Sequence, residues 1–280
     1  MLLPHHSFEK DADGICRVEF NSLVEMFNVG NSSGEARDKR NAKEADEQAG
    51  YSEYSGTRLA EVLKTFSDPP QDAIFKVEEI RAGVEGSSEQ LVGRKRKRRY
   101  NLEDGDEPDP EQVVLRDPNC WELIEHKTVS KSVIRIGVNV ALNAGGSKEK
   151  LMYRGGAVAA LVDVLSASGH SVELVMFNCI AGVTEDGLTG VMKVYVKKAD
   201  MPVDLPSITY ALTTPGFYRT AVMAAEFRCW SSSLSGRWGW CCAIPEADQK
   251  DMDIVFDANI TSKEAAIEAV SKYATAFTTH

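Results

Sequence analysis

The chain has 280 residues, of which 43% are hydrophobic and 26% charged, and its formal net charge is −10. This composition is typical of a globular domain, and the acidic balance disfavours non-specific adhesion to nucleic acid or anionic membranes. The six cysteines form no CxxC pair, so we predict reduced thiols and no zinc site. No run approaches the ~20 apolar residues that cross a bilayer, and no signal segment is visible at the start. We therefore expect a cytoplasmic protein.

Residues 1–92 are predicted to form a smaller, mainly helical N-terminal region. Residues 15–20 alternate as in a strand, and Ser22 can cap a short helix that follows. Residues 31–54 are polar with interleaved charges, which indicates a solvated helix or a loop. Helical spacing predicts two further helices, over 56–66 and over 73–86, the second with Ile74, Val77 and Ile80 as its buried stripe.

The sharpest change in composition lies at residues 93–112, where six consecutive cations precede an acid-rich stretch. We predict a linker or surface loop here. The cations could grip a phosphate backbone and the tyrosine behind them could stack on a base. A run of like charges is also commonly just solvated, and the following acids can neutralise it. The candidate nucleic-acid contacts are Arg94, Lys95, Arg96, Lys97, Arg98, Arg99 and Tyr100.

Residues 133–178 show the pattern strand, turn, helix, strand. A β-branched apolar run over 133–142 and a strand-like run over 171–177 flank a helix at 154–165. Such a βαβ unit forms a parallel sheet with a right-handed crossover. We therefore predict that residues 113–280 fold as a Rossmann-like α/β core, with a mostly parallel sheet and helices on both faces.

Later segments complete this core. Residues 190–198 alternate as a strand, and residues 252–257 form a short buried strand. Pro215 and Gly216 begin a helix predicted to reach residue 227. Thr261 and Glu264 form a capping box that opens a terminal helix ending at residue 277.

Ligands of parallel sheets bind at the carboxyl ends of the strands, where the glycine-rich turn 143–147 is expected to lie. Its backbone N–H groups and Lys148 would favour an anion, although a plain tight turn explains the same residues. Arg154 is a cation placed at a predicted helix start, which suggests an acidic partner or a ligand. Asp257 ends a buried strand at the same edge. A carboxylate at this position can act as a base or hold a metal, and a cap or turn role explains it equally well. Thr213 and Thr214, in a loop before a helix, allow the same two interpretations.

Three tryptophans, at 230, 238 and 240, form a candidate stacking or partner-binding platform, or alternatively cover the sheet edge. No histidine lies at a telling distance from a nucleophile, so no catalytic triad is predicted. The candidate residues for a partner or ligand are Asn143, Ser147, Lys148, Arg154, Asp257, Trp230, Trp238 and Trp240.

The segment 133–178, with Asp257 after a later strand, resembles the von Willebrand factor A fold. That fold has a strand, a metal-binding Asp-x-Ser-x-Ser loop, a helix and a second strand, with Thr and Asp ligands on later loops. On this resemblance the turn 143–147 takes the place of the metal-binding loop, but only Ser147 matches. Asn143 replaces the Asp and Gly145 replaces the first Ser. Because Mg²⁺ prefers anionic oxygen, the resemblance implies a degenerate copy without its metal.

Residues 154–174 are similar to a segment common in uncharacterised proteins of bacteriophages and bacterial mobile elements. Those proteins also carry a short proline-containing segment upstream, as residues 117–121 do here. The similarity extends over residues 113–178 and implies a phage or mobile-element origin without a known activity.

Two classes of function follow. The first is a non-enzymatic binding protein of phage or mobile-element origin, acting in replication or transcription. Its partner would be a nucleic acid, single-stranded more than duplex, or a phage or host protein. The alternative is a Rossmann-like enzyme acting on a phosphate-containing substrate through Ser147, Lys148, Arg154 and Asp257. The missing nucleophile, metal ligands and phosphate loop favour the first, and we expect no cofactor.

Overall fold

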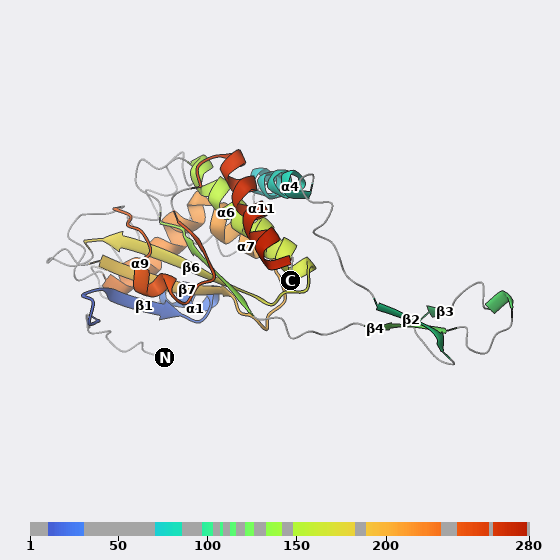
Figure 1. Cartoon of the computed structure of the whole chain (residues 1–280). Coiled ribbons are helices and arrows are strands. Elements are labelled where there is room, and N and C mark those ends of the chain that lie inside the picture. The colour runs from blue at the N-terminus through green and yellow to red at the C-terminus, as the bar shows by residue number, and fades with distance from the viewer. Residues whose placement is uncertain are drawn as a thin grey trace.

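The core of the protein is a five-stranded sheet with the strand order β1-β7-β6-β5-β8 (Figure 1). Its strands are β1 Cys16–Phe20, β5 Ile134–Asn139, β6 Val172–Ala181, β7 Thr189–Lys197 and β8 Ile254–Phe256. The computed structural model describes residues 11–30, 71–85, 97–102, 107–108, 113–115, 121–125, 133–141, 148–182, 189–230, 240–257 and 260–278.

The sheet is mostly parallel, as predicted. Strand β5 pairs in parallel with β6 on one side and with β8 on the other. The predicted βαβ unit is formed by β5, helix α6 (Lys148–Ala167) and β6. Strand β7 runs antiparallel to β6, and β1 pairs in parallel with β7. The carboxyl ends of β5, β6 and β8 therefore lie at one edge of the sheet.

Helices lie on both faces of the sheet, as predicted, but very unevenly. One face carries the main hydrophobic core, to which the apolar residues of β5, such as Ile136 and Val138, contribute. The described helices that join this core are α1 Leu23–Gly30, α4 Gln71–Glu85, α6, α7 Leu205–Thr213, α8 Pro215–Phe217, the π-helix η1 Tyr218–Val222, α9 Met223–Trp230 and α11 Lys263–Thr278.

The second face of the sheet is covered by the segment 240–252, which contains the short helix α10 (Glu246–Gln249). Ile244 packs there in a smaller cluster with Phe177 and Cys179, and Met252 packs against that cluster. A Cβ atom on Gly137 would lie only 3.0 Å from Met252 Cγ. The glycine in β5 therefore lets this segment approach the sheet closely.

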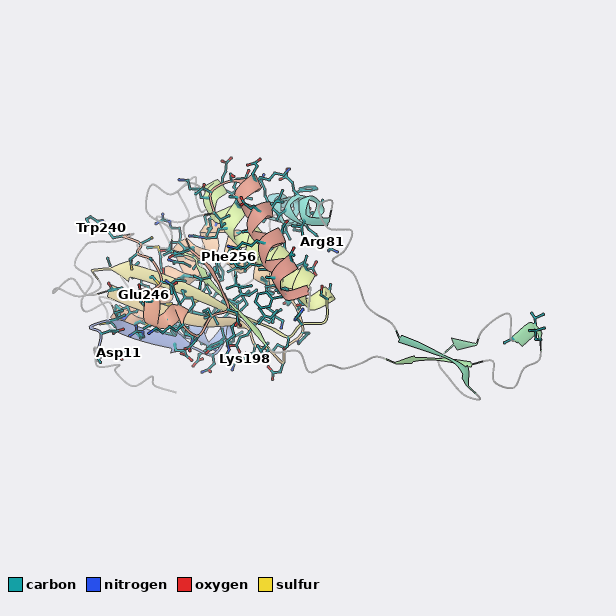
Figure 2. The ribbon with its side chains drawn as sticks, in the orientation of Figure 1. Asp11, Arg81, Lys198, Trp240, Glu246 and Phe256 are labelled. Carbon is teal, nitrogen blue, oxygen red and sulfur yellow. The ribbon has the colours of Figure 1, made fainter. Side chains whose placement is uncertain are left out.

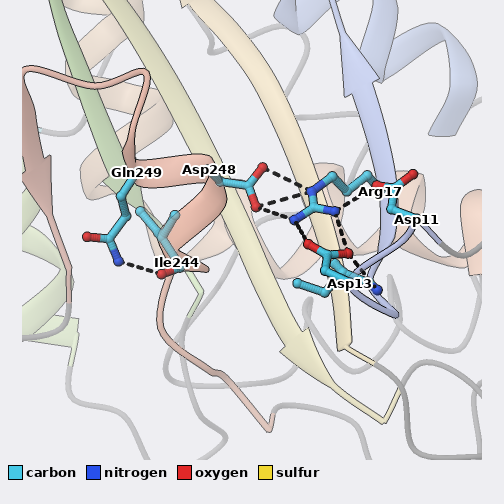
Figure 3. Close-up of polar contacts among 7 residues, drawn as sticks. Asp11, Asp13, Arg17, Ile244, Asp248 and Gln249 are labelled. Carbon is cyan, nitrogen blue, oxygen red and sulfur yellow. Dashed lines mark hydrogen bonds and ion pairs between the residues drawn. The ribbon is translucent and has the colours of Figure 1, made fainter.

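An ion cluster holds α10 over this second face (Figure 3). Arg17 on β1 donates to Asp248 of α10, with Nη2 2.9 Å from Asp248 Oδ2. The same guanidinium donates from Nη1 to Asp11 at 2.7 Å and from Nη2 to Asp13 at 2.6 Å. These three carboxylates raise the pKa of Arg17 well above its usual value, Asp13 contributing most. The cluster joins the first strand of the chain to a segment more than 200 residues later.

We predict that Arg17→Met loosens the segment 240–252. Removing a partly buried charge with several charge-assisted hydrogen bonds should lower the free energy of unfolding by about 1–3 kcal/mol. Amide hydrogen exchange in residues 240–252 should become faster. The control is Arg81→Met, which removes an exposed ion pair with Asp163 and should change stability by less than ~1 kcal/mol. Equal effects of the two variants would contradict the assigned role of Arg17.

The helix starts follow from side-chain caps. Ser22 Oγ accepts from the N–H of Glu25 at 3.1 Å, so Ser22 caps α1 as predicted. The capping box predicted from Thr261 and Glu264 is wrong, because Ser262 Oγ accepts from the N–H of Ala265 at 3.3 Å. Ser262 is therefore the N-cap of α11.

The predicted division at residue 93 differs from the structure. Residues 1–92 contribute β1 to the core sheet and α4 to the core helix layer. In α4 the buried positions include Val77 and Ile80, as predicted, whereas Ile74 is only partly buried. The apolar residues of this strand and helix pack in the main hydrophobic core, which is why the N-terminal part does not form a separate region.

The predicted linker at residues 93–112 contains two strands. Strand β4 (Trp121–Glu125) pairs antiparallel with β2 (Lys97–Leu102) and with β3 (Glu107–Pro108). Together they form a separate three-stranded sheet, drawn apart from the core in Figure 1. Cross-strand pairing thus places Lys97, Arg98 and Arg99 of the basic run on an extended, paired backbone.

Candidate functional site

Two polar side chains meet where β5 and β8 end. Asn139 is the last residue of β5, and Asp257 directly follows β8. Asn139 Nδ2 donates to Asp257 Oδ1 at 2.9 Å and to the carbonyl oxygen of Cys242 at 2.9 Å. Asn139 Oδ1 accepts from the N–H of Ala141 at 3.1 Å. These contacts confirm the expected position of Asp257 at the carboxyl edge.

The second oxygen of Asp257 is also engaged. Oδ2 accepts from the N–H of Ile244 at 3.3 Å. Asn139 and Asp257 together therefore fix residues 242–244 to the sheet edge. Asn139 was not among the predicted site residues, although an amide inside the apolar run 133–142 is a signal in the sequence.

Arg154 approaches the same edge from α6 and is only 5% exposed. Because α6 begins at Lys148, Arg154 lies in the second helical turn, and the prediction that it stands at the helix N-terminus is wrong. Its Nη2 donates to the carbonyl oxygen of Ala141 at 3.3 Å. Its Nε has no hydrogen-bond partner among the described residues.

The charge of Arg154 is poorly compensated. Burial lowers the pKa of its guanidinium, and the nearby Asp257, followed by Cys241 and Tyr218, opposes this shift only in part. Desolvation of a cation disfavours the charged form, whereas neighbouring anionic groups favour it. The pKa of Arg154 is lowered overall, so the effect of burial is larger than the opposing effect of these neighbouring groups.

A second buried polar pair lies on the adjacent strand. Asn178 of β6 donates from Nδ2 to Glu226 Oε2 of α9 at 3.3 Å. Burial raises the pKa of Glu226 to about 7, against smaller opposing effects of Asn178 and Arg219. The sequence-based prediction missed this carboxyl group. Glu226 follows Ala224 and Ala225 in a small, apolar stretch, which is the signal that it faces inward.

The junction between α7 and α8 lies against α6. A Cβ atom on Gly155 would come within 3.0 Å of Leu212 Cβ and closer still to the Leu212 carbonyl group. Thr213, just after this contact, donates its hydroxyl to the carbonyl oxygen of Thr209 at 2.7 Å. The buried hydroxyl of Thr214 has no hydrogen-bond partner among the described residues. The hydroxyl donor of Thr213 is therefore used within α7, whereas no described residue uses that of Thr214.

The helix predicted from Pro215 to residue 227 continues to Trp230 and contains a π-helical turn at Tyr218–Val222. Such turns are rare and occur frequently at functional sites. This one places Tyr218 and Arg219 close enough to Arg154 and Glu226, respectively, to influence their pKa values.

No disulfide joins the described cysteines. Burial raises the pKa of Cys241 to about 11 and that of Cys229 to about 12. Burial also raises the pKa of Cys179 and of Cys242. These four thiols therefore stay protonated near neutral pH and are poor nucleophiles.

The predicted tryptophan platform is not formed as a unit. Trp230 is 2% exposed in the core at the end of α9, so it cannot contact a partner. Trp240 is 60% exposed and lies at the periphery (Figure 2). Trp238 lies outside the described residues. A helix-end tryptophan with an apolar environment packs inward, which the spacing of three tryptophans alone does not reveal.

The other predicted site residues have three different placements. Asn143, Ser147, Arg94, Lys95 and Arg96 lie outside the described residues. Lys148 is exposed in the first turn of α6. The remaining members of the basic run, Lys97, Arg98, Arg99 and Tyr100, all belong to β2.

The edge does not suit the divalent cation of the von Willebrand factor A pattern. Asp257 uses both carboxylate oxygens to accept N–H groups, and the guanidinium of Arg154 lies close to it. A hard cation needs several unprotonated oxygen ligands and is repelled by a neighbouring cation. Within the described ranges, no cluster of three or more His, Cys, Asp or Glu residues could hold a metal ion.

Comparison with known families finds a match over nearly the whole chain. The model of DUF7192, a domain of unknown function, matches residues 9–279. The chain belongs to this family. No curated protein and no solved structure matches the chain significantly. No helix in the described part of the chain is long and apolar enough to cross a membrane.

Proposed function

We propose that this chain is a non-enzymatic protein that binds single-stranded nucleic acid through its basic run. The observation that carries this proposal is the pairing of β2 with β4. Three cations and Tyr100 occupy successive positions of β2, and β4 begins with Trp121. Cations that follow a phosphate backbone, combined with aromatic residues on which bases stack, are the usual means of binding single strands.

The acidic surroundings of this run favour a specific partner over general adhesion. The whole chain carries a net charge of −10, and residues 103–111 contain six acids. These charges oppose non-specific attraction to polyanions. In the register of the small sheet, Lys97 stands opposite Glu125. Arg98 and Arg99 stand opposite the uncharged Ile124 and Leu123.

The carboxyl edge of the core supports a role without catalysis. The carboxylate of Asp257 is engaged by Asn139 and by the backbone of Ile244. A general base must be within hydrogen-bond reach of the substrate proton, and a nucleophilic thiol must ionise. Asp257 is occupied by the chain itself, and the described thiols with raised pKa values stay protonated. This arrangement gives the enzyme alternative less support than the binding function.

Two further points belong to this proposal. The parallel pairing of β5 with β6 and with β8, and the place of Asp257 directly after β8, support a degenerate von Willebrand factor A-like core. The protein would bind its nucleic-acid partner during replication or transcription of a bacteriophage or mobile element.

The proposal is tested by fluorescence anisotropy with labelled single-stranded DNA, duplex DNA and RNA. We expect single strands to bind more tightly than duplex at physiological salt. Changing Lys97, Arg98 and Arg99 to Ala should weaken binding at least tenfold. The slope of log K against log salt should fall by about 2, since each phosphate contact on a single strand contributes roughly 0.7.

The matched control removes three exposed cations from the core, Arg135, Lys250 and Lys272, and gives the same net charge. This variant should keep nearly the binding of the unmodified protein. Equal losses of affinity in both variants would show that binding depends only on the net charge of the protein. Absence of binding at physiological salt would overturn the proposal and favour a protein partner.

A further inference from the structure

The carboxyl edge of the core holds buried polar groups that have no hydrogen-bond partner among the described residues. Arg154 is 5% exposed, and the described residues give it one hydrogen bond, from Nη2 to Ala141. A guanidinium has five N–H donors in a planar fork. Its Nε points to no acceptor among the described residues. Buried donors without partners are rare in folded proteins and call for an explanation.

A structural ion pair does not explain this arginine. Asp257, the carboxylate that most influences it, is already engaged by Asn139 and Ile244. Burial outweighs the attraction of Asp257, Cys241 and Tyr218. The surroundings thus compensate the charge of the guanidinium only in part. An additional anion would supply the missing compensation.

A second unused group lies on the neighbouring segment. Thr214 is 7% exposed, and its hydroxyl has no hydrogen-bond partner among the described residues. The close approach of Leu212 to Gly155 places the segment that leads to Thr214 beside the turn of α6 that carries Arg154. A guanidinium and a hydroxyl on adjacent segments are the donors that oxyanions prefer.

We propose that Arg154 and Thr214 bind a small oxyanion, a phosphate or a carboxylate, at the carboxyl edge of the sheet. The planar fork of Arg154 matches either group with two parallel hydrogen bonds, and the Thr214 hydroxyl adds a third donor. The position also agrees with the general placement of ligands at strand ends in open α/β sheets. This site is separate from the basic run on β2.

The test uses inorganic phosphate and acetate as probes, with sodium chloride at matched ionic strength as the reference. Melting temperature and isothermal titration calorimetry are measured on the full chain. We expect a saturable rise in melting temperature, of about 5 °C at a phosphate concentration ~100-fold above Kd. A response to acetate alone would assign a carboxylate ligand, and a response to phosphate alone a phosphate ligand.

Arg154→Met keeps the length of the side chain and removes its donors. This variant should lose the response to the probe. Without probe it should melt at the same temperature as the unmodified protein or higher, because it no longer buries an under-compensated charge. Arg154→Lys keeps the charge but not the fork, so its affinity should fall at least tenfold. Arg135→Met, which removes an arginine that is exposed on the sheet, should respond like the unmodified protein.

Three results would overturn the site. One is that neither probe changes the melting temperature beyond sodium chloride. Another is that Arg154→Met and Arg154→Lys respond like the unmodified protein. The third is that Arg154→Met without probe melts several degrees lower or fails to fold, because Arg154 would then be a structural charge. The β2 triple variant must keep the response, which separates this site from the proposed nucleic-acid surface.

Discussion

Replacing Gly155 by Ala should destabilise the protein by about 2–3 kcal/mol, whereas the same change at the next residue, Gly156, should not. A Cβ atom on Gly155 would meet the backbone carbonyl group of Leu212 at the end of α7. That backbone cannot move without shifting α7 or α6, which pack together in the core. Overpacking of this kind forces backbone shifts and is destabilising.

Gly156 is the matched control because it occupies the same helix, one position later. Its added Cβ atom would lie 3.1 Å from Ile80 Cδ1, the end of a flexible side chain. A change from glycine to alanine inside a helix gains about 1 kcal/mol from backbone entropy and helix propensity. Gly156→Ala should therefore be neutral or stabilise by up to ~1 kcal/mol.

Urea denaturation of both variants measures the difference. The denaturant midpoint of Gly155→Ala should fall without a change in the slope m, because the unfolded surface is unchanged. If the two variants had equal stability, the close contact between α6 and α7 would be wrong. The contact matters for the candidate anion site, since it sets the distance between Arg154 and the segment that carries Thr214.

The local pattern of the sequence was sufficient to predict the central part of the fold. The alternation and β-branched content of the runs around β5 and β6, with a helical run between them, predict a parallel pair. The structure confirms this pair. The same logic located β7 and β8 and the terminal helix α11. These elements were predictable because their side-chain periodicity reflects one buried face.

Long-range pairing was not predictable in this way. Strand β1 pairs with β7, more than 170 residues later in the chain. The alternation of apolar and polar residues in β1 does not indicate which strand it pairs with. Strands β2 and β3 of the small sheet are a basic run and a Glu-Pro pair, so composition indicates a linker there, whereas their partner β4 lies in the stretch predicted to belong to the core. The placement of α10 over the second face depends on Arg17 and Asp248, two charged residues that sequence spacing does not connect.

The sequence predicts where the candidate site lies but only some of its residues. Asp257 was identified because it follows a buried strand. Arg154 was selected for a wrong reason, because α6 starts six residues earlier than the pattern indicated. Asn139 and Glu226 were missed because a polar residue inside an apolar run shows only that it is buried. Its partner depends on tertiary packing.

Glu226 should make the protein less stable as the pH rises from about 4.5 to about 7. Burial raises its pKa from 4.5 to about 7 in the folded protein. Between these values the folded state binds more protons than the unfolded state, so the free energy of unfolding falls as the pH rises. The stabilisation is fully present below pH 4.5 and is lost above pH 7. Its size is about 3 kcal/mol, since each pKa unit corresponds to roughly 1.4 kcal/mol.

Glu226→Gln isolates this effect, because glutamine has nearly the same shape and carries no charge. Asn178 and Arg219 are the groups that lower the pKa of Glu226 in part. The neighbouring thiols Cys229 and Cys241 have raised pKa values and stay protonated over this pH range. At pH 4.5 the variant and the unmodified protein should have similar stability. At pH 8 the variant should be more stable, by about 3 kcal/mol, because it no longer buries an ionised carboxylate.

The experiment is urea denaturation of both proteins at several pH values from 4.5 to 8, and the difference between them cancels the titration of all other groups. Glu264→Gln is the control, because the pKa of Glu264 is shifted in the opposite direction to that of Glu226. Hydrogen bonds from its own backbone N–H and from Ser262 lower the pKa of the exposed Glu264, so its contribution to stability is lost as the pH falls. A flat difference for Glu226→Gln between pH 4.5 and pH 8 would show that its carboxyl group is in contact with water. The buried hydrogen bond between Asn178 and Glu226, and with it the packing of α9 on β6, would then be wrong.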